Sequence, residues 1–244
     1  MQVELKKLVE NNYGYSEAVK NLRTNVQFSG SDVKVIAFTS SLPGEGKTDV
    51  AYALTQSFVQ IGKKVLFIDA DIRKSVLAAR LELREEVPGL SEYLSGQSEL
   101  SDVICRTNYE GLDFIFSGKY SPAASELLEE ERFTRLIAEA KETYDYVFVD
   151  TPPLGVVTDC AVIAKSVDGI IFIIESGAIS YHLLQKVKAQ LDTTGTRVLG
   201  VVLNKVDASK ETYYGKYGKY GRYGKYSRYD KYGRYGAYGV ESKE

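Results

Sequence analysis

Three short stretches contain the residue types that phosphoryl-transfer chemistry requires, and the first is GEGKT (44–48). It matches the end of the phosphate-binding pattern GxxxxGK(S/T), with Ser41 in place of the leading glycine. Gly44 and Gly46 would let backbone N–H groups surround phosphate oxygens. Lys47 would place a positive charge on the β- and γ-phosphates, and the Thr48 hydroxyl would bind Mg²⁺. The loop therefore predicts a site for ATP.

The second stretch is FIDADIR (67–73), which ends an apolar run. Asp69 and Asp71 are two residues apart, so in an extended strand their carboxylates project to the same side. Paired carboxylates beside a nucleotide suit Mg²⁺ binding, and one of them can accept a proton from an attacking hydroxyl. Arg73 follows on that side, and we expect it to balance or steer phosphate charge.

The third stretch is VFVDTPP (147–153), an apolar run that ends in Asp150. Together the three stretches predict a catalytic set of Lys47, Asp69, Asp71 and Asp150. We expect Thr48, Asp69 and Asp150 to hold Mg²⁺. The expected nucleotide contacts are Ser41, Pro43, Gly44, Glu45, Gly46, Lys47, Thr48, Asp49, Arg73 and Asn204.

These stretches need a scaffold, and the hydrophobic pattern supplies one. Short, nearly continuous apolar runs, typical of strands buried on both faces, occur at 33–40, 64–71, 112–118, 145–153, 168–176 and 196–204. Helical patterns lie between them at about 15–28, 47–61, 124–142, 158–166 and 179–192. The alternation predicts an α/β fold with a doubly wound, mostly parallel sheet and helices on both faces. Ligands of such sheets bind at the carboxyl ends of the strands.

Bulk properties exclude several classes of protein. Hydrophobic residues make up 44% and charged residues 26% of the 244-residue chain, which is typical of soluble domains. The N-terminus is charged, which argues against a signal peptide. No apolar run reaches the roughly 18 residues that a membrane span requires. Cys105 and Cys160 stand in no metal-binding spacing, so we expect two reduced thiols in a cytosolic protein.

The C-terminal segment differs from the rest in composition. Tyrosine recurs at every third position from Tyr214 to Tyr238, with Lys, Arg and Gly between. That stretch has a net charge of +6, so the remainder of the chain has a net charge of −8. Such a segment builds no core, and we expect a flexible tail. The predicted organisation is an N-terminal helical segment (1–30), a nucleotide-binding domain (31–208) and the tail (209–244).

The combination of these motifs resembles the bacterial tyrosine kinases (BY-kinases) of capsule and exopolysaccharide assembly. The resemblance rests on SSLPGEGKT, VLFIDADIR, GLSEYLSG, YDYVFVDTPP, VLGVVLN and the tyrosine cluster, and it runs from about residue 15 to the end. It implies a P-loop fold and ATP·Mg²⁺-dependent autophosphorylation between subunits. The implied phosphate acceptors are Tyr213, Tyr214, Tyr217, Tyr220, Tyr223, Tyr226, Tyr229, Tyr232, Tyr235 and Tyr238.

The resemblance also implies partners. The family's ExxRxxR motif of ring formation corresponds to Glu17, Lys20 and Arg23, with Lys20 replacing an arginine and so losing its planar fork. A homo-oligomeric ring is therefore expected, with an octamer as one candidate size. The kinase is expected in the cytoplasm, recruited to the inner face of the membrane by a transmembrane polysaccharide co-polymerase that activates it. A cognate tyrosine phosphatase would reset the tail.

Other functions remain open on the sequence alone. Partitioning ATPases of the Min and Par type share the core, but their phosphate loop has a further lysine where this chain has Leu42. A GTP-binding switch would use NKVD (204–207), although Asn204 can equally contact an adenine. A nucleic-acid binder would use tyrosines interleaved with Lys and Arg, but the kinase-like body argues against nucleic acid.

Ala123 and Ala124 also depart from the family's Asn-Pro, with no consequence that the sequence reveals.

Overall fold

A computed structural model describes residues 1–5, 13–83 and 86–206. The chain divides into two compact units with the boundary between Lys205 and Val206. All ten predicted acceptor tyrosines lie outside the described residues. The first unit runs from Met1 to Lys205.

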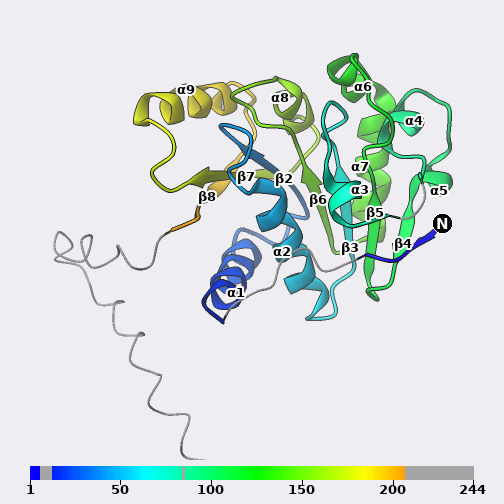
Figure 1. Cartoon of the computed structure of the whole chain (residues 1–244), viewed down its shortest axis with the longest axis horizontal. Helices are drawn as coiled ribbons and strands as arrows, with labels where there is room; N and C mark the ends of the chain where they lie inside the picture. Colours follow the sequence, from blue (N-terminus) through cyan, green and yellow to red (C-terminus); the bar gives the residue numbers. More distant parts are fainter. Residues whose placement is uncertain (6–12, 84–85, 207–244) are drawn as a thin grey trace, which may run out of the picture. The chain divides into compact units, whose positions relative to one another are not determined.

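Within the described residues, one eight-stranded sheet has the order β1-β4-β5-β3-β6-β2-β7-β8 (Figure 1). Neighbouring strands run parallel except β4 and β5, which are antiparallel. The predicted doubly wound, mostly parallel α/β fold is thereby confirmed. The strands are β1 (Gln2–Val3), β2 (Val35–Ser40), β3 (Val65–Asp69), β4 (Cys105–Thr107), β5 (Leu112–Ile115), β6 (Tyr146–Asp150), β7 (Gly169–Glu175) and β8 (Val198–Asn204).

Helices cover the two faces of this sheet. They are α1 (Tyr13–Gln27), α2 (Lys47–Val59), α3 (Leu77–Arg80), α4 (Leu90–Leu94), α5 (Leu100–Val103), α6 (Ala124–Glu129), α7 (Glu131–Thr143), α8 (Asp159–Ala164) and α9 (Tyr181–Asp192). Side chains of α1, α2 and α3 pack into one core cluster, and side chains of α4 and α6 to α9 pack into the other. Among the described residues, no helix combines the length and apolar character needed to cross a membrane.

The central strands are buried on both faces because successive side chains point to opposite sides of a strand. In β3, Val65 and Phe67 pack with the α2 face, whereas Leu66 and Ile68 pack with the opposite face. This continuous apolar pattern makes β3 readable from the sequence. Cys105 and Cys160 are both free and buried, as expected for reduced structural thiols.

The helical pattern at 124–142 is two helices rather than one. Glu130 separates α6 from α7, with φ −62° and ψ 145°, an extended conformation. The reason is packing: α6 lies against α8, whereas α7 lies against β6. The chain must change direction between these two contacts, and three consecutive glutamates, Glu129 to Glu131, place that break in a polar stretch.

The expectation that every strand is buried on both faces is wrong for β8. This strand is at the edge of the sheet, and its Val201 and Leu203 side chains are each 54% exposed. An edge strand has a neighbour on one side only, so an apolar sequence does not ensure burial. The bounds of β8 nevertheless agree closely with the predicted strand.

Candidate active site

The three predicted motifs converge because their strands are neighbours. β3 pairs with β6 so that Asp69 lies opposite Asp150. β6 in turn pairs with β2, with Asp150 opposite Phe38, just before the loop that contains GEGKT. The carboxyl ends of these parallel strands therefore bring the phosphate loop and both aspartates to one edge of the sheet.

Lys47 and Thr48 both bind the carboxylate of Asp150. The Lys47 ammonium lies 2.5 Å from Asp150 Oδ1, and the Thr48 hydroxyl donates to Asp150 Oδ2 at 2.6 Å. Lys47 is 8% and Asp150 2% exposed. A buried charge is tolerated when it is paired and hydrogen-bonded, so these three groups form a preorganised, nearly dry cluster.

The phosphate loop depends on two glycines with positive φ, Gly44 (87°) and Gly46 (85°). Asn204, at the end of β8, donates from Nδ2 to the Glu45 carbonyl at 2.9 Å. A Cβ atom added to Gly46 would lie 2.2 Å from that Nδ2 atom. Gly46 is therefore required for the backbone conformation and for the close approach of Asn204.

Glu45 supports the loop with its side chain. Its buried carboxylate accepts hydrogen bonds from the N–H groups of Leu42 (2.7 Å) and Glu175 (3.1 Å). Lys205 donates to the Gly44 carbonyl at 2.7 Å and pairs with Glu175 at 2.8 Å. Sequence reasoning treated Glu45 as a nucleotide contact and missed Glu175 and Lys205. Lys205 directly follows Asn204, so the NKVD stretch was the available signal.

Asp69 is the most perturbed acid of the site. It is 1% exposed, and burial, followed by the negative charge of Asp150, raises its pKa to about 7 from an ordinary value of 3.8. Hydrogen bonds from the Ser75 hydroxyl and the Asp71 N–H oppose this rise. Ser75 was not singled out in the sequence. With no metal bound, Asp69 therefore changes protonation near neutral pH, the range in which a general base works best.

Asp71 and Arg73 differ in their surroundings. Asp71 accepts a hydrogen bond from the Lys74 N–H at 2.9 Å, and partial burial raises its pKa. Arg73 instead forms a two-pronged ion pair with the fully buried Asp159, with N–O distances of 2.8 and 3.1 Å. Its guanidinium also donates to Ser125 Oγ. The structure thus places Arg73 in a link between β3, α6 and α8.

The remaining predicted contacts lie around the loop. Ser41 is fully buried, and its hydroxyl has no hydrogen-bond partner within the described part of the chain. Pro43 is exposed at the loop surface. Asp49, in the first turn of α2, forms an ion pair with Arg80 of α3. Asp49 therefore connects the helix after the loop to the helix after β3.

Comparison with known proteins decides the family. Residues 33–199 match the family model described as "AAA domain". The tyrosine-protein kinase CpsD of Streptococcus agalactiae is 41% identical over 200 residues, which cover 80% of this chain and 87% of CpsD. The chain belongs to the bacterial tyrosine kinase family. It is therefore an enzyme of the tyrosine-protein kinase class.

Solved structures agree with this assignment. The kinase domain of the Escherichia coli tyrosine kinase ETK has a TM-score of 0.74 and 33% identity, covering 79% of this chain and 78% of that one. MinD from Pyrococcus horikoshii, complexed with Mg-ADP, has a TM-score of 0.59 and 24% identity, with 70% of each chain covered. The second likeness shows the shared P-loop fold alone.

The donor set of this bacterial tyrosine kinase fits a magnesium ion bound together with a nucleotide. Within residues 1–5, 13–83 and 86–206, no group of three or more His, Cys, Asp and Glu side chains is arranged to hold a metal. Magnesium in nucleotide sites needs only one or two carboxylates, because phosphates and water supply the other ligands. The facing pair Asp69 and Asp150, with the Thr48 hydroxyl, meets that requirement.

The stretch that corresponds to the ring motif lies on α1. Glu17 and Lys20 form an exposed ion pair at 2.7 Å. Arg23 instead donates to the carbonyl and the hydroxyl of Ser57 on α2, both at 2.8 Å. Arg23 thus attaches α1 to the helix that begins with Lys47, whereas Glu17 and Lys20 face solvent.

Proposed function

We propose that this kinase transfers the γ-phosphoryl group of ATP to tyrosine hydroxyls of its own C-terminal segment. The observation that carries the proposal is the convergence of Lys47, Thr48 and Asp150 beside the buried, easily protonated Asp69. The ten tyrosines of the tail supply acceptors in the same chain. A tether raises their effective concentration, so weak recognition of each tyrosine suffices.

The proposed mechanism follows from this geometry. Asp69 accepts the proton of the incoming tyrosine hydroxyl, whose oxygen attacks the γ-phosphorus as the bond to ADP breaks. Lys47 balances the charge of the transferred group. Thr48, Asp69 and Asp150 would hold Mg²⁺, which supplies further neutralisation of phosphate charge. Residues 41–49, with Asn204 behind them, position the triphosphate.

We further propose that transfer occurs between copies in a ring. The exposed pair Glu17 and Lys20 makes the solvent-facing side of α1 the surface for that assembly, whereas Arg23 is bonded to Ser57 of its own chain. Each phosphotyrosine adds a charge of about −1.5 to −2. A few modifications would therefore reverse the +6 charge of the tail and release it from acidic neighbours. The division into residues 1–30, 31–208 and 209–244 belongs to this proposal.

The cellular role is a proposal drawn from the family. We propose that the kinase regulates synthesis and export of a capsular or extracellular polysaccharide. A transmembrane co-polymerase would recruit it from the cytoplasm to the inner face of the membrane and activate it, and a tyrosine phosphatase would reverse its action. The motifs that support this role are those shared with the family throughout the described chain.

One experiment tests the activity. The purified chain is incubated with Mg²⁺ and γ-labelled ATP, with and without a cytoplasmic peptide of the adaptor, and phosphate is mapped by mass spectrometry. We expect label on residues 213–238 and its loss in Lys47→Met. An Asp69→Ala variant that labelled the tail at the wild-type rate would refute the role of Asp69. Release of free phosphate with an unlabelled tail would instead favour an ATPase switch of the Min and Par type.

A further inference from the structure

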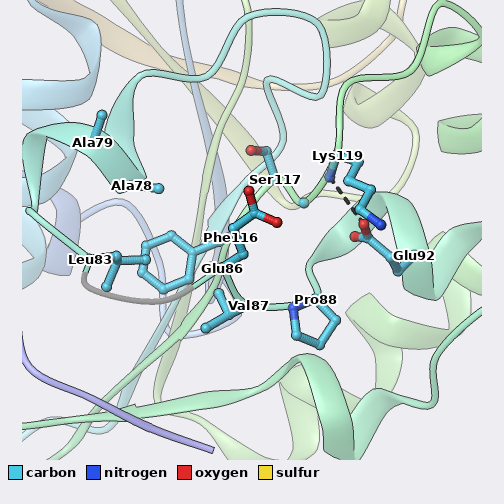
Figure 2. A pocket seen from close by; sticks show the side chains of 11 residues that line it. Ala78, Ala79, Leu83, Glu86, Val87, Pro88, Glu92, Phe116, Ser117 and Lys119 are labelled. Atoms are coloured by element: carbon cyan, nitrogen blue, oxygen red, sulfur yellow. Dashed lines mark hydrogen bonds between the residues drawn. The ribbon is translucent and has the colours of Figure 1, made fainter.

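A cavity of about 660 Å³ lies between α3, the segment 86–88 and the end of β5 (Figure 2). None of its lining residues belongs to the catalytic set. Its apolar lining comes from Ala78, Ala79, Leu83, Val87, Pro88 and Phe116. The Phe116 ring stacks on Phe114, with ring centroids 5.1 Å apart, so the cavity has a rigid aromatic wall.

The sheet places this cavity next to the catalytic acids. Ile115 of β5 lies opposite Ile68 of β3, so Phe116 follows at the level of Asp69, which itself lies opposite Asp150. Phe116 is in the same core cluster as Phe67 and Phe148. Side chains two residues apart point to the same face of a strand, so Asp69 and Asp150 point to the α2 face, as Phe116 does. Because adjacent strands are about 5 Å apart, the strand of Phe116 is roughly 10 Å from that of Asp150.

The charges around the cavity favour a positively charged ligand. Of the described residues that line it, Glu86 and Glu92 are acidic and Lys119 is basic. Glu92 accepts from the N–H groups of Gly89 (2.9 Å) and Lys119 (3.2 Å) and from the Ser91 hydroxyl (3.0 Å). Burial alone would raise the pKa of Glu92, but these bonds hold it below its usual range. Among the described residues that line the cavity, two carboxylates against one ammonium give a net negative charge.

The C-terminal segment of this chain has the matching chemistry. Between Tyr214 and Tyr238 it repeats one aromatic ring and usually one Lys or Arg every three residues. In the polyproline II conformation, which has three residues per turn and a rise of about 3.1 Å per residue, side chains three residues apart lie on the same side of the chain and about 9 Å apart. That spacing is close to the separation between the strands of Phe116 and Asp150. A ring in the cavity would therefore leave the next tyrosine of a peptide in this conformation at the catalytic acids.

We propose that the cavity binds one unmodified tyrosine of the C-terminal segment while the tyrosine three residues away occupies the phosphoryl-transfer site. The proposal rests on the function proposed above, and it explains how the kinase would select tyrosines of the C-terminal segment. A tyrosine alone would bind weakly, whereas two tyrosines in register would bind together. Phosphorylation of the docked tyrosine would place its negative charge against Glu86 and Glu92. The cavity would then release the modified residue.

Binding is measured without catalysis. The whole chain, with its ten tail tyrosines replaced with serine, is titrated into a fluorescent peptide of residues 219–229, KYGRYGKYSRY, and anisotropy is followed. Ala79→Phe fills the cavity from an exposed position and should weaken binding about tenfold, as expected for loss of one buried aromatic ring. Glu86→Lys should weaken it less, and mainly at low salt.

Matched variants control for folding and for total charge. Ala189→Phe makes the same change at an exposed position of α9, and Glu110→Lys makes the same charge change in the loop before β5. Neither should alter peptide binding. All four variants should keep the wild-type melting temperature and affinity for a fluorescent ATP analogue. Equal peptide affinity in Ala79→Phe, Glu86→Lys and the parent would overturn the proposal.

Kinetics separate docking from activity. In the wild-type chain, a peptide that retains Tyr223 and Tyr226 should have a KM about tenfold below one that retains Tyr226 alone, with the same kcat. Ala79→Phe, or one glycine inserted between the two tyrosines, should abolish that difference. Equal KM values for both peptides in the wild-type chain would overturn the docking while leaving the kinase activity intact. Pocket-dependent binding without any phosphate transfer would support the docking and refute the acceptor assignment.

Discussion

Asp69 shows how one buried residue links stability to chemistry. Its carboxyl faces Asp150 across a strand pair and is fully enclosed. With a folded pKa of about 7 and an ordinary value of 3.8, Asp69 retains a proton in the folded state that the unfolded chain releases between these pH values. Its contribution to stability is therefore complete below about pH 4 and is lost as the pH rises through 7.

We expect Asp69→Asn to be more stable than the wild-type chain at pH 8 and equally stable near pH 4, when metal is removed with a chelator. Each pKa unit corresponds to about 1.4 kcal/mol, so the gain is at most roughly 4 kcal/mol. Urea unfolding across this pH range measures it. Asp32→Asn, an exposed control, should follow the wild-type curve. A constant difference between Asp69→Asn and the wild-type chain at all pH values would contradict the account.

Gly46 is the residue of the phosphate loop at which substitution should be tolerated least. Gly46→Ala would force an alanine to φ 85° and bring its Cβ within 2.2 Å of Asn204 Nδ2. We expect ATP affinity to fall at least tenfold, because a left-handed alanine costs about 1–2 kcal/mol before the clash is counted. Titration with a fluorescent ATP analogue measures the loss.

The double variant Gly46→Ala, Asn204→Ala separates the two causes. It removes the clash and leaves the strained backbone, so it should recover part of the affinity. Gly62→Ala is a control for positive φ alone, because Gly62 has φ 78° and an added Cβ would have no atom within 4 Å. Full recovery in the double variant would show that the backbone conformation contributes nothing.

At the scale of elements, Arg73 connects the end of β3 to α6 and α8. Removal of its side chain in Arg73→Ala would leave Asp159 buried without its charged partner, which should destabilise the fold by about 1–3 kcal/mol. Adding Asp159→Asn should restore much of that loss, as a double-mutant cycle in urea would show. If Arg73 steers phosphate, as its sequence position suggests, Arg73→Lys would raise the KM for ATP. Because lysine keeps the charge beside Asp159 but loses the planar fork, it would lower stability less than Arg73→Ala does.

The elements also show what a sequence can and cannot predict. The convergence of Lys47, Asp69 and Asp150 was predictable, because apolar strands identify a parallel sheet and each motif follows a strand. The Arg73–Asp159 pair was not, because it joins the segment after β3 to the first turn of α8, 86 residues away in the chain. The support of the phosphate loop by Glu175 and Lys205 likewise depends on the pairing of β7 with β8. Local pattern holds no information about such long-range contacts.

Errors in the expected elements have the same origin. The break at Glu130 follows from where α6 and α7 pack, and the exposure of Val201 and Leu203 follows from the position of β8 at the edge. Neither is a property of the local residues. Short helices such as α3 and α4 were missed because one turn leaves no hydrophobic period to detect.

At the scale of the whole molecule, charge is divided unequally along the chain. The stretch from Tyr214 to Tyr238 carries +6 and the remainder −8. We expect the unmodified chain to assemble at low salt and the phosphorylated chain to dissociate, because phosphate removes the attraction between tail and acidic surface. Multi-angle light scattering of both forms measures their mass.

Substitutions on α1 test the surface of that assembly. Glu17→Lys, at the exposed ion pair with Lys20, should lower the assembled mass without changing the stability of one copy. Glu110→Lys is the control with the same charge change on an unrelated loop. Equal masses for the phosphorylated and unmodified chains would refute the charge switch.

The contact of Lys205 with the Gly44 carbonyl has a geometric consequence. It holds the chain at the phosphate loop, and this point is the origin from which the maximum reach of each tail tyrosine can be measured. Tyr213 is eight residues beyond Lys205, so it can reach no farther than about 28 Å from that origin. Tyr238 is 33 residues beyond Lys205, with a limit of roughly 115 Å. Position in the chain alone therefore sorts the acceptors, with early tyrosines restricted to sites nearby and late ones within reach of distant sites.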